Sequence, residues 1–246
     1  MLLKTLETWF LWVMIYSIIG WIYESTICSV SQRRFVNRGF LNGPYCPIYG
    51  NGALLVILIL GRIHNPVLLF LLGALVTCSL EYLTSYLMEK LFHARGWDYS
   101  KRKCNLNGRV CLLGAVVFGA FSVALVLGLH PLVVSLTDRL TGMTRHIVSL
   151  ALLAAMIADY IVTLTGMAGF RTRLEEIADY LEQQKEESKL RASEAYLKRR
   201  AELKRRLSLQ QRRLIAAFPT LKMKKPKHDE TLQKLREALR KAKERR

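Results

Sequence analysis

The chain has 246 residues, 51% of them hydrophobic, and a formal net charge of +18 at pH 7. A soluble single domain rarely combines such hydrophobicity with such a charge, so composition argues against an ordinary soluble domain. The charge is also uneven, because residues 171–246 alone carry a net charge of +12. We therefore expect two parts, a transmembrane helix-bundle domain over residues 1–170 and a basic cytoplasmic helical tail over residues 171–246.

Five apolar segments reach or approach the roughly 20 residues that a helix needs to cross a bilayer. They cover residues 9–30, 47–63, 67–89, 109–129 and 146–168. The second segment is short and rich in glycine, so it either crosses fully or forms a half-span that re-enters the membrane. The predicted fold class is all-α, a polytopic membrane bundle of about five transmembrane helices followed by a long helical tail.

Basic residues in the connections predict the orientation, because cytoplasmic loops are enriched in lysine and arginine. The first connection contains Arg33, Arg34 and Arg38, and the third contains six basic residues between positions 90 and 109. The second connection has only Arg62. We expect the amino terminus outside and the tail inside a multi-pass protein of the bacterial cytoplasmic membrane.

Residues 39–52 interrupt the apolar pattern with four glycines and two prolines. Glycine permits positive φ and proline removes an amide donor, so this backbone is not a membrane helix. Peptide groups that no helix pairs must find partners in protein, water or ligand. The segment is therefore either a plain connector or one wall of a site on the cytoplasmic side.

Three carboxylates, Glu24, Glu81 and Asp159, fall within or at the inner end of the apolar spans. An ionised group at such depth costs about 2.5–3.5 kcal/mol on insertion scales, so it normally faces the bundle interior and a partner. Arg38 and Arg109 are the natural partners. A helix-capping or interfacial position remains an alternative for Glu24, while Glu81 and Asp159 favour an interior polar network, which could serve function or only join helices.

The third connection mixes aromatic, acidic, amide and glycine residues, which predicts an ordered loop, although Trp97 and Tyr99 could equally be interfacial anchors. Five scattered cysteines form no CxxC pair and histidine is sparse, so we expect no metal site and no cofactor. The candidate polar site comprises Glu24, Arg38, Asn42, Tyr45, Tyr49, Glu81, Asp98, Tyr99, Asn107, Arg109 and Asp159.

Four strings in the chain are familiar: residues 20–24 (GWIYE), 37–50 (NRGFLNGPYCPIYG), 97–100 (WDYS) and 105–112 (NLNGRVCL). Together they resemble the family labelled putative ABC-transporter type IV, small bacterial membrane proteins, over about residues 9–166. The resemblance implies a permease-like role. The chain has no GxxxxGK[ST] phosphate loop, so a separate ATPase subunit would have to supply energy, and five spans are few enough to favour a homodimer or a membrane partner.

The tail predicts a helix from residue 171 to Phe218 and a short second helix over residues 229–244. Its charge is ordered, since residues 171–187 carry a net charge of −3 and residues 189–213 carry +8. We rank a solvated basic helix first, an anionic-lipid surface second and nucleic-acid contact as unlikely. The residues expected to contact lipid or a partner are Lys198, Arg199, Arg200, Lys204, Arg205 and Arg206.

Two functions therefore compete, and a membrane enzyme ranks third, because Tyr, Asp, Glu and Arg are sufficient for acid–base chemistry. The first is a transport component without an ATPase of its own, whose polar site lies on the cytoplasmic side. The second is a structural or regulatory membrane protein that binds anionic lipid or a cytoplasmic partner through its tail. We do not expect an enzyme, because no HExxH, GxSxG or histidine-rich metal set is present and no catalytic residue can be named.

Overall fold

The computed structural model describes residues 2–92, 94–169, 173–174, 176–177, 207–218, 222–223, 229, 232–233 and 235–236. The chain forms two compact units. The bundle unit comprises Met1–Leu87 and Asp98–Tyr160, and the tail unit comprises Met88–Trp97 and Ile161–Arg246. Composition alone places the boundary at residue 170. In the structure, the tail unit also includes residues 88–97 and 161–170.

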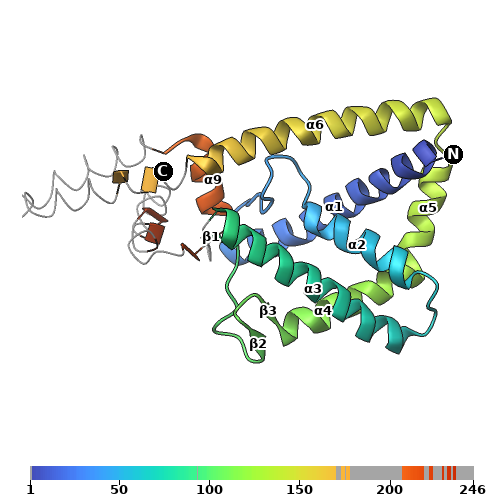
Figure 1. Cartoon of the computed structure of the whole chain (residues 1–246), viewed down its shortest axis with the longest axis horizontal. Helices are drawn as coiled ribbons and strands as arrows, with labels where there is room; N and C mark the ends of the chain where they lie inside the picture. The colour runs from blue at the N-terminus through green and yellow to red at the C-terminus, as the bar shows by residue number, and fades with distance from the viewer. Residues whose placement is uncertain are drawn as a thin grey trace, which may run out of the picture. The chain divides into compact units, whose positions relative to one another are not determined.

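Helices dominate the described residues (Figure 1). They are α1 (Leu2–Gln32), α2 (Pro47–Leu60), α3 (Pro66–Phe92), α4 (Leu112–Ala124), the π-helix η1 (Leu125–Leu129), α5 (His130–Asp138), α6 (Gly142–Ala168) and α9 (Leu209–Ala217). Four helical stretches in the described part are long and apolar enough to cross a membrane: Leu2–Gln32, Pro66–Phe92, Leu112–Asp138 and Gly142–Met167. The predicted class, an all-α membrane bundle, is confirmed.

The short second span is the helix that differs most from its neighbours. α2 has 14 residues, about 21 Å at 1.5 Å per residue, which is less than the roughly 30 Å hydrocarbon core. It begins beside the middle of α1, because the Cys46 amide donates a hydrogen bond of 2.9 Å to the Ser17 carbonyl oxygen. Residues 33–46 therefore run back from the end of α1 into the bundle before α2 starts.

The fourth span is longer than the sequence predicts. The expected end near residue 129 is wrong, because α4 continues through η1 into α5 and ends at Asp138. Pro131 explains the widened turn, since proline has no amide hydrogen and its ring collides with the carbonyl four residues earlier. A π-turn just before the proline absorbs this conflict without ending the helix.

Glycines allow the helices of the bundle to approach closely. A Cβ added at Gly50 in α2 would overlap the carbonyl oxygen of Val13 in α1, and one added at Gly73 in α3 would overlap Ser122 in α4. Small residues at such crossings let backbones approach in the membrane. The central apolar cluster joins α1, α2, α3, η1 and α5 through Tyr16, Val56, Leu60, Leu69, Leu125, Val126 and Val133.

Two short pairs of strands complete the described structure. Strands β2 (Asn105–Leu106) and β3 (Val110–Cys111) pair in the bundle unit, and β1 (Ala94–Arg95) pairs with β4 (Lys222–Met223) in the tail unit. Both pairs are antiparallel. The loop between α3 and α4 is therefore ordered, as its composition predicts.

The described residues of the tail unit have a small apolar core. It contains Leu174, Ile177, Leu207, Ile215, Leu232 and Leu235, with Phe92 and Phe218 packed against it. The expected uninterrupted helix up to Phe218 is wrong, because Leu207 and Ser208 are not helical and a Ser208–Gln211 capping box starts α9. The predicted lipid or partner residues, Lys198, Arg199, Arg200, Lys204, Arg205 and Arg206, lie outside the described residues.

The packing of α1 on α2 gives a first prediction. Gly50→Ala should lower the free energy of unfolding by about 1–3 kcal/mol, because the new methyl group meets backbone and cannot be accommodated by a side-chain rotation. Gly128→Ala is the matched control, since nothing lies within 4 Å of a Cβ added there. Thermal unfolding of the detergent-purified variants measures both, and equal midpoints would contradict this packing.

Candidate functional site

Residues 33–46 form an irregular segment, the inward loop, that lies along α1. The Ser29 hydroxyl accepts a hydrogen bond of 3.0 Å from the Val36 amide, and the Ser25 hydroxyl accepts one of 3.2 Å from the Arg38 amide. Ser25 and Ser29 are four residues apart and so lie on one face of the helix. This polar face pairs loop amides that no helix pairs, as irregular backbone in a bundle requires.

Asn37 folds the inward loop onto itself. Its carboxamide oxygen accepts hydrogen bonds from the Trp21 indole at 2.7 Å and from the Gly39 amide at 3.1 Å. Its nitrogen donates to the Asn42 carbonyl oxygen at 2.9 Å. One side chain thus satisfies three groups and joins the loop to α1.

Asp159 of α6 holds the tip of the inward loop. Its Oδ1 accepts hydrogen bonds from the Asn42 amide at 2.9 Å and from the Asn42 side chain at 2.7 Å. Its Oδ2 accepts from the Gly43 amide and from the Tyr45 hydroxyl, each at 2.8 Å. Burial, together with the bond to Asp159, raises the pKa of Tyr45 well above its ordinary value, so the phenol remains a donor. Asp159 is therefore a clamp for the loop.

Apolar contacts support the clamp. Leu41, which is 0% exposed, forms a buried cluster with Met14 and Tyr45. Met156 and Tyr160 of α6 pack against that cluster. The loop tip is therefore fixed by packing as well as by the carboxylate.

Glu24 of α1 joins the loop to α2. The Tyr49 hydroxyl donates a 2.6 Å hydrogen bond to its Oε1, and the Arg38 Nε lies 3.5 Å from its Oε2. Burial raises the pKa of the Cys46 thiol to about 12, so this neighbour stays protonated and is not a reactive thiolate. Arg38, one of the two arginines expected to partner the buried carboxylates, therefore pairs with Glu24.

Glu81 of α3 is more buried than Glu24, with only 6% of its surface exposed. The Tyr99 hydroxyl donates to Oε1 at 3.3 Å, while Oε2 has no hydrogen-bond partner within the described part of the chain. Burial and then the negative charges of Glu81 and Glu24 raise the pKa of Tyr99. Both glutamates therefore act on one phenol, which places them in one electrostatic neighbourhood.

The loop before α4 positions Tyr99. The Tyr99 amide donates to the Gly108 carbonyl oxygen at 2.8 Å, and Asn107 and Gly108 have φ of 53° and 68°. A Cβ at Gly108 would meet Asp98 and Ser100, so glycine fits both the conformation and the space. The Asp98 side chain accepts from the Ser100 amide at 3.0 Å. Asp98 thus shapes the loop.

Arg109 is buried beside α3, one turn beyond Glu81. Its guanidinium lies 5.4 Å from the Tyr82 ring centre and 5.5 Å from that of Tyr86, within cation–π range, and it donates to the Ser85 hydroxyl at 3.4 Å. Asn107 donates to the Tyr82 hydroxyl at 3.0 Å. These contacts fasten the loop to α3.

The candidate residues thus fall into three groups. Glu24, Arg38, Tyr49, Glu81 and Tyr99 form what we call the polar site. Asn42, Tyr45 and Asp159 form the clamp, and Asp98, Asn107 and Arg109 shape the loop before α4. Among the residues that the structure describes, no three His, Cys, Asp or Glu side chains gather as metal ligands.

A second polar cluster, which joins the first half of α1 to α5 and the start of α6, was missed by sequence reasoning. The Tyr16 hydroxyl and His130 Nδ1 lie 2.9 Å apart, and the Trp12 indole donates to the Thr137 hydroxyl at 3.1 Å. Arg145, which directly precedes the predicted span 146–168, is a buried α6 residue bonded to the Thr137 and Leu140 carbonyl oxygens. A signal existed in the four-residue spacing of Trp12 and Tyr16, but their partners are more than 100 residues away in the chain.

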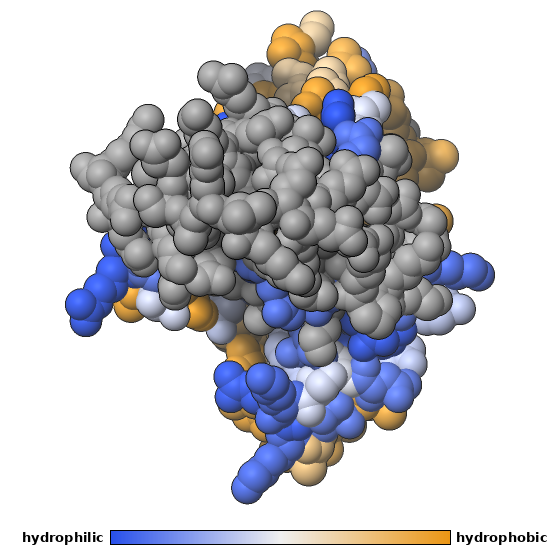
Figure 2. All heavy atoms as spheres, turned by 90° about the vertical axis from the view of Figure 1, so that its left-hand side faces the viewer, coloured by the Kyte–Doolittle hydropathy of each residue, from blue (hydrophilic) through white to orange (hydrophobic). Residues whose placement is uncertain are grey.

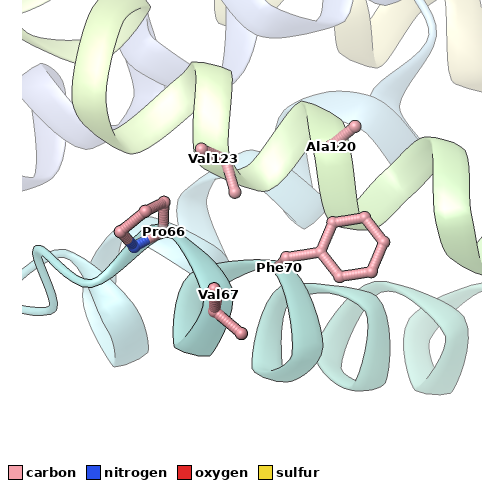
Figure 3. Close-up of a pocket in the computed structure, with 5 residues that line it drawn as sticks. All are labelled: Pro66, Val67, Phe70, Ala120 and Val123. Carbon is pink, nitrogen blue, oxygen red and sulfur yellow. The ribbon is translucent and has the colours of Figure 1, made fainter.

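The surface of the chain has both hydrophilic and apolar regions. The loop between α3 and α4 has three exposed basic residues, Lys101, Arg102 and Lys103. Figure 2 shows hydrophilic residues in the lower part of the face that it draws. By contrast, Figure 3 shows an open pocket with an apolar lining between the start of α3 and α4, lined by Pro66, Val67, Phe70, Ala120 and Val123. It contains no residue of the polar site.

Long apolar helices, buried carboxylates and an irregular segment inside a bundle define a helical membrane protein. Residues 11–164 match the model of the family described as putative ABC-transporter type IV. The match covers more than half of the chain, which therefore belongs to this family. Comparison with curated proteins found no match. Comparison with solved structures found none either.

The clamp gives a second prediction. Asp159→Asn should lower the free energy of unfolding by roughly 2 kcal/mol or more, because an amide nitrogen replaces one of two oxygens that each accept two hydrogen bonds. The freed loop should also be cut faster by trypsin at exposed Arg33 and Arg34. Thermal unfolding in detergent and timed proteolysis measure these effects.

Asp138→Asn is the control for the clamp, since Asp138 is exposed at the end of α5. It should leave both the midpoint and the cleavage rate unchanged. A clamp variant that behaves like this control would show that Asp159 does not hold the loop.

Proposed function

We propose that the chain is the permease-like membrane component of a transport system in the bacterial cytoplasmic membrane. The observation that supports this best is the inward loop with the short α2 that follows it. Broken helices whose irregular backbone lies inside a bundle are a recurrent way to line a solute path. Membership of the type IV family supports the same role.

The polar site would contact the solute on the cytoplasmic side. Each of its carboxylates accepts a hydrogen bond from a phenol, Glu24 from Tyr49 and Glu81 from Tyr99. Arg38 adds a positive charge beside Glu24. Such paired donors and acceptors suit a small polar solute rather than a lipid tail. The basic residues of the connections support an orientation with both loops on the cytoplasmic face. We assign no enzymatic activity to these groups.

The chain has no phosphate loop, so a separate ATPase subunit would drive transport. Affinity purification of the intact chain from cross-linked membranes of its host, followed by mass spectrometry, tests this. We expect a protein with a GxxxxGK[ST] loop to be enriched relative to an unrelated membrane protein with the same tag. Repeated recovery without such a subunit would favour the alternative, a structural or regulatory membrane protein.

Glu24→Gln separates transport from a structural role. Glutamine keeps an oxygen that can accept from Tyr49, and the Arg38 pair is partly exposed, so the loss of stability should be within about 1 kcal/mol. Transport should nevertheless fail, because the charge at the site is lost. The measurement compares small polar solutes in cells and medium, by mass spectrometry, among strains that carry no chain, the native chain or the variant.

The native chain should change the level of at least one solute, and Glu24→Gln should remove that change. Glu176→Gln is the control, since Glu176 is an exposed residue of the tail unit paired with Arg173. It should behave as the native chain does. A large fall in the unfolding midpoint of Glu24→Gln, with no solute affected by the native chain, would support the structural alternative instead.

A further inference from the structure

Three consecutive basic residues in the loop before α4, Lys101, Arg102 and Lys103, form what we call the basic turn. All three are exposed. Asp98 is the only acidic residue of the loop between α3 and α4, and its carboxylate accepts a hydrogen bond from the Ser100 amide at 3.0 Å. Within the described part of the chain, none of the three basic side chains forms an ion pair. The basic turn therefore presents three positive charges to whatever surrounds the loop.

Backbone hydrogen bonds hold the basic turn in one shape. The Arg102 amide donates to the Tyr99 carbonyl oxygen at 2.8 Å, which closes the turn. The Asn105 side chain donates to the Arg102 carbonyl oxygen, also at 2.8 Å. A loop that is already ordered loses less conformational freedom when it binds a ligand. The three charges are thus positioned before a ligand arrives.

The basic turn lies beside the end of a membrane span. The Leu112 amide donates to the Cys104 carbonyl oxygen at 3.1 Å, and Leu112 is the first residue of α4. Figure 1 shows the β2–β3 pair beside the start of this helix. The apolar stretch Leu112–Asp138 has 27 residues. Such a helix is about 40 Å long, more than the roughly 30 Å hydrocarbon core, so its ends reach the lipid headgroups.

Exposed leucines accompany the exposed charges. Leu106 of β2 is 59% exposed, and Leu112 and Leu113 in the first turn of α4 are 57% and 56% exposed. Surfaces that lie in the membrane interface combine basic residues, which contact headgroups, with apolar residues, which contact acyl chains. A soluble phosphate or a nucleic acid would leave these leucines in water. The combination therefore favours a phospholipid as the partner.

We propose that the basic turn binds the headgroup of an anionic phospholipid at the membrane surface beside the start of α4. Each lysine or arginine near an anionic membrane surface strengthens binding about fivefold. The lipid phosphate would lie against the three charges, and its acyl chains would contact the exposed leucines. This interaction surface is separate from the proposed transport function, because it uses no residue of the polar site.

Native mass spectrometry of the purified full chain tests the proposal by counting bound lipids. The chain is placed in mixed micelles with increasing mole fractions of phosphatidylglycerol or of phosphatidylcholine. We expect phosphatidylglycerol to bind more tightly than phosphatidylcholine. Replacing all three residues of the basic turn by glutamine should weaken phosphatidylglycerol binding about tenfold or more and leave phosphatidylcholine binding unchanged.

The matched control replaces three other exposed basic residues, Lys4, Arg62 and Arg139, by glutamine. It removes the same charge and keeps the same tail, so it should bind phosphatidylglycerol as the native chain does. Equal weakening in the two triple variants would show that binding follows net charge, and the proposal would be wrong. Equal affinity of the native chain for the two lipids would also overturn it.

A second readout uses the exposed thiol of Cys104, which directly follows the basic turn. Phosphatidylglycerol should slow its alkylation by N-ethylmaleimide in the native chain and in the control, but not in the variant of the basic turn. Slowing to the same extent in all three chains would contradict a site at the basic turn. Neither readout depends on transport or on an ATPase subunit, so failure here is distinct from failure of the proposed function.

Discussion

The bundle depends on one requirement, that the peptide groups of residues 33–46 find partners inside it. A membrane-spanning structure tolerates irregular backbone only where protein or a water-filled cavity satisfies it. Here the donors and acceptors come from α1 through Ser17, Ser25 and Ser29, and from α6 through Asp159. The position of the inward loop follows from these contacts, and so does the starting point of α2.

Three of the acidic residues of the bundle unit, Glu24, Glu81 and Asp159, differ in how many hydrogen bonds and ion pairs they make. Asp159 accepts four hydrogen bonds from the loop, so its charge is used to hold structure. Glu24 accepts from one phenol and pairs with one arginine. Glu81 has a single long hydrogen bond and a buried oxygen that no described donor meets. In the described part of the chain, the hydrogen bonds and ion pairs of these carboxylates therefore become fewer from Asp159 through Glu24 to Glu81.

Close helix crossings connect this polar region to the apolar core. Gly20 contacts Tyr49 so closely that a Cβ there would overlap the ring, and Tyr49 donates to Glu24. The packing of α1 on α2 therefore also sets the distance between phenol and carboxylate. The residues that would hold the bundle together are therefore largely the residues that would contact a solute. For this reason a variant that changes charge, rather than one that changes packing, distinguishes the structural hypothesis from the transport hypothesis.

Much of the fold followed from the sequence alone. Length and apolarity were sufficient to predict a helical membrane bundle, and the glycines and prolines of residues 39–52 predicted irregular backbone, because these properties are local. Arg38 was also expected to pair with a buried carboxylate, but the structure decided that this carboxylate is Glu24. Continuation of α4 past residue 129 did not, because a π-turn before Pro131 depends on the packing around it.

What only the tertiary structure decided is which acidic residue does what. Glu81 and Asp159 have the same sequence signal, a carboxylate in an apolar span. Asp159 nevertheless accepts hydrogen bonds from residues 116 and 117 positions away, whereas one oxygen of Glu81 has no hydrogen-bond donor in the described part of the chain. Hydrogen bonds of that sequence separation are set by how the helices pack, and no local pattern encodes them. The sequence therefore determined that buried charge exists in this protein, and the packing determined which partners each charge has.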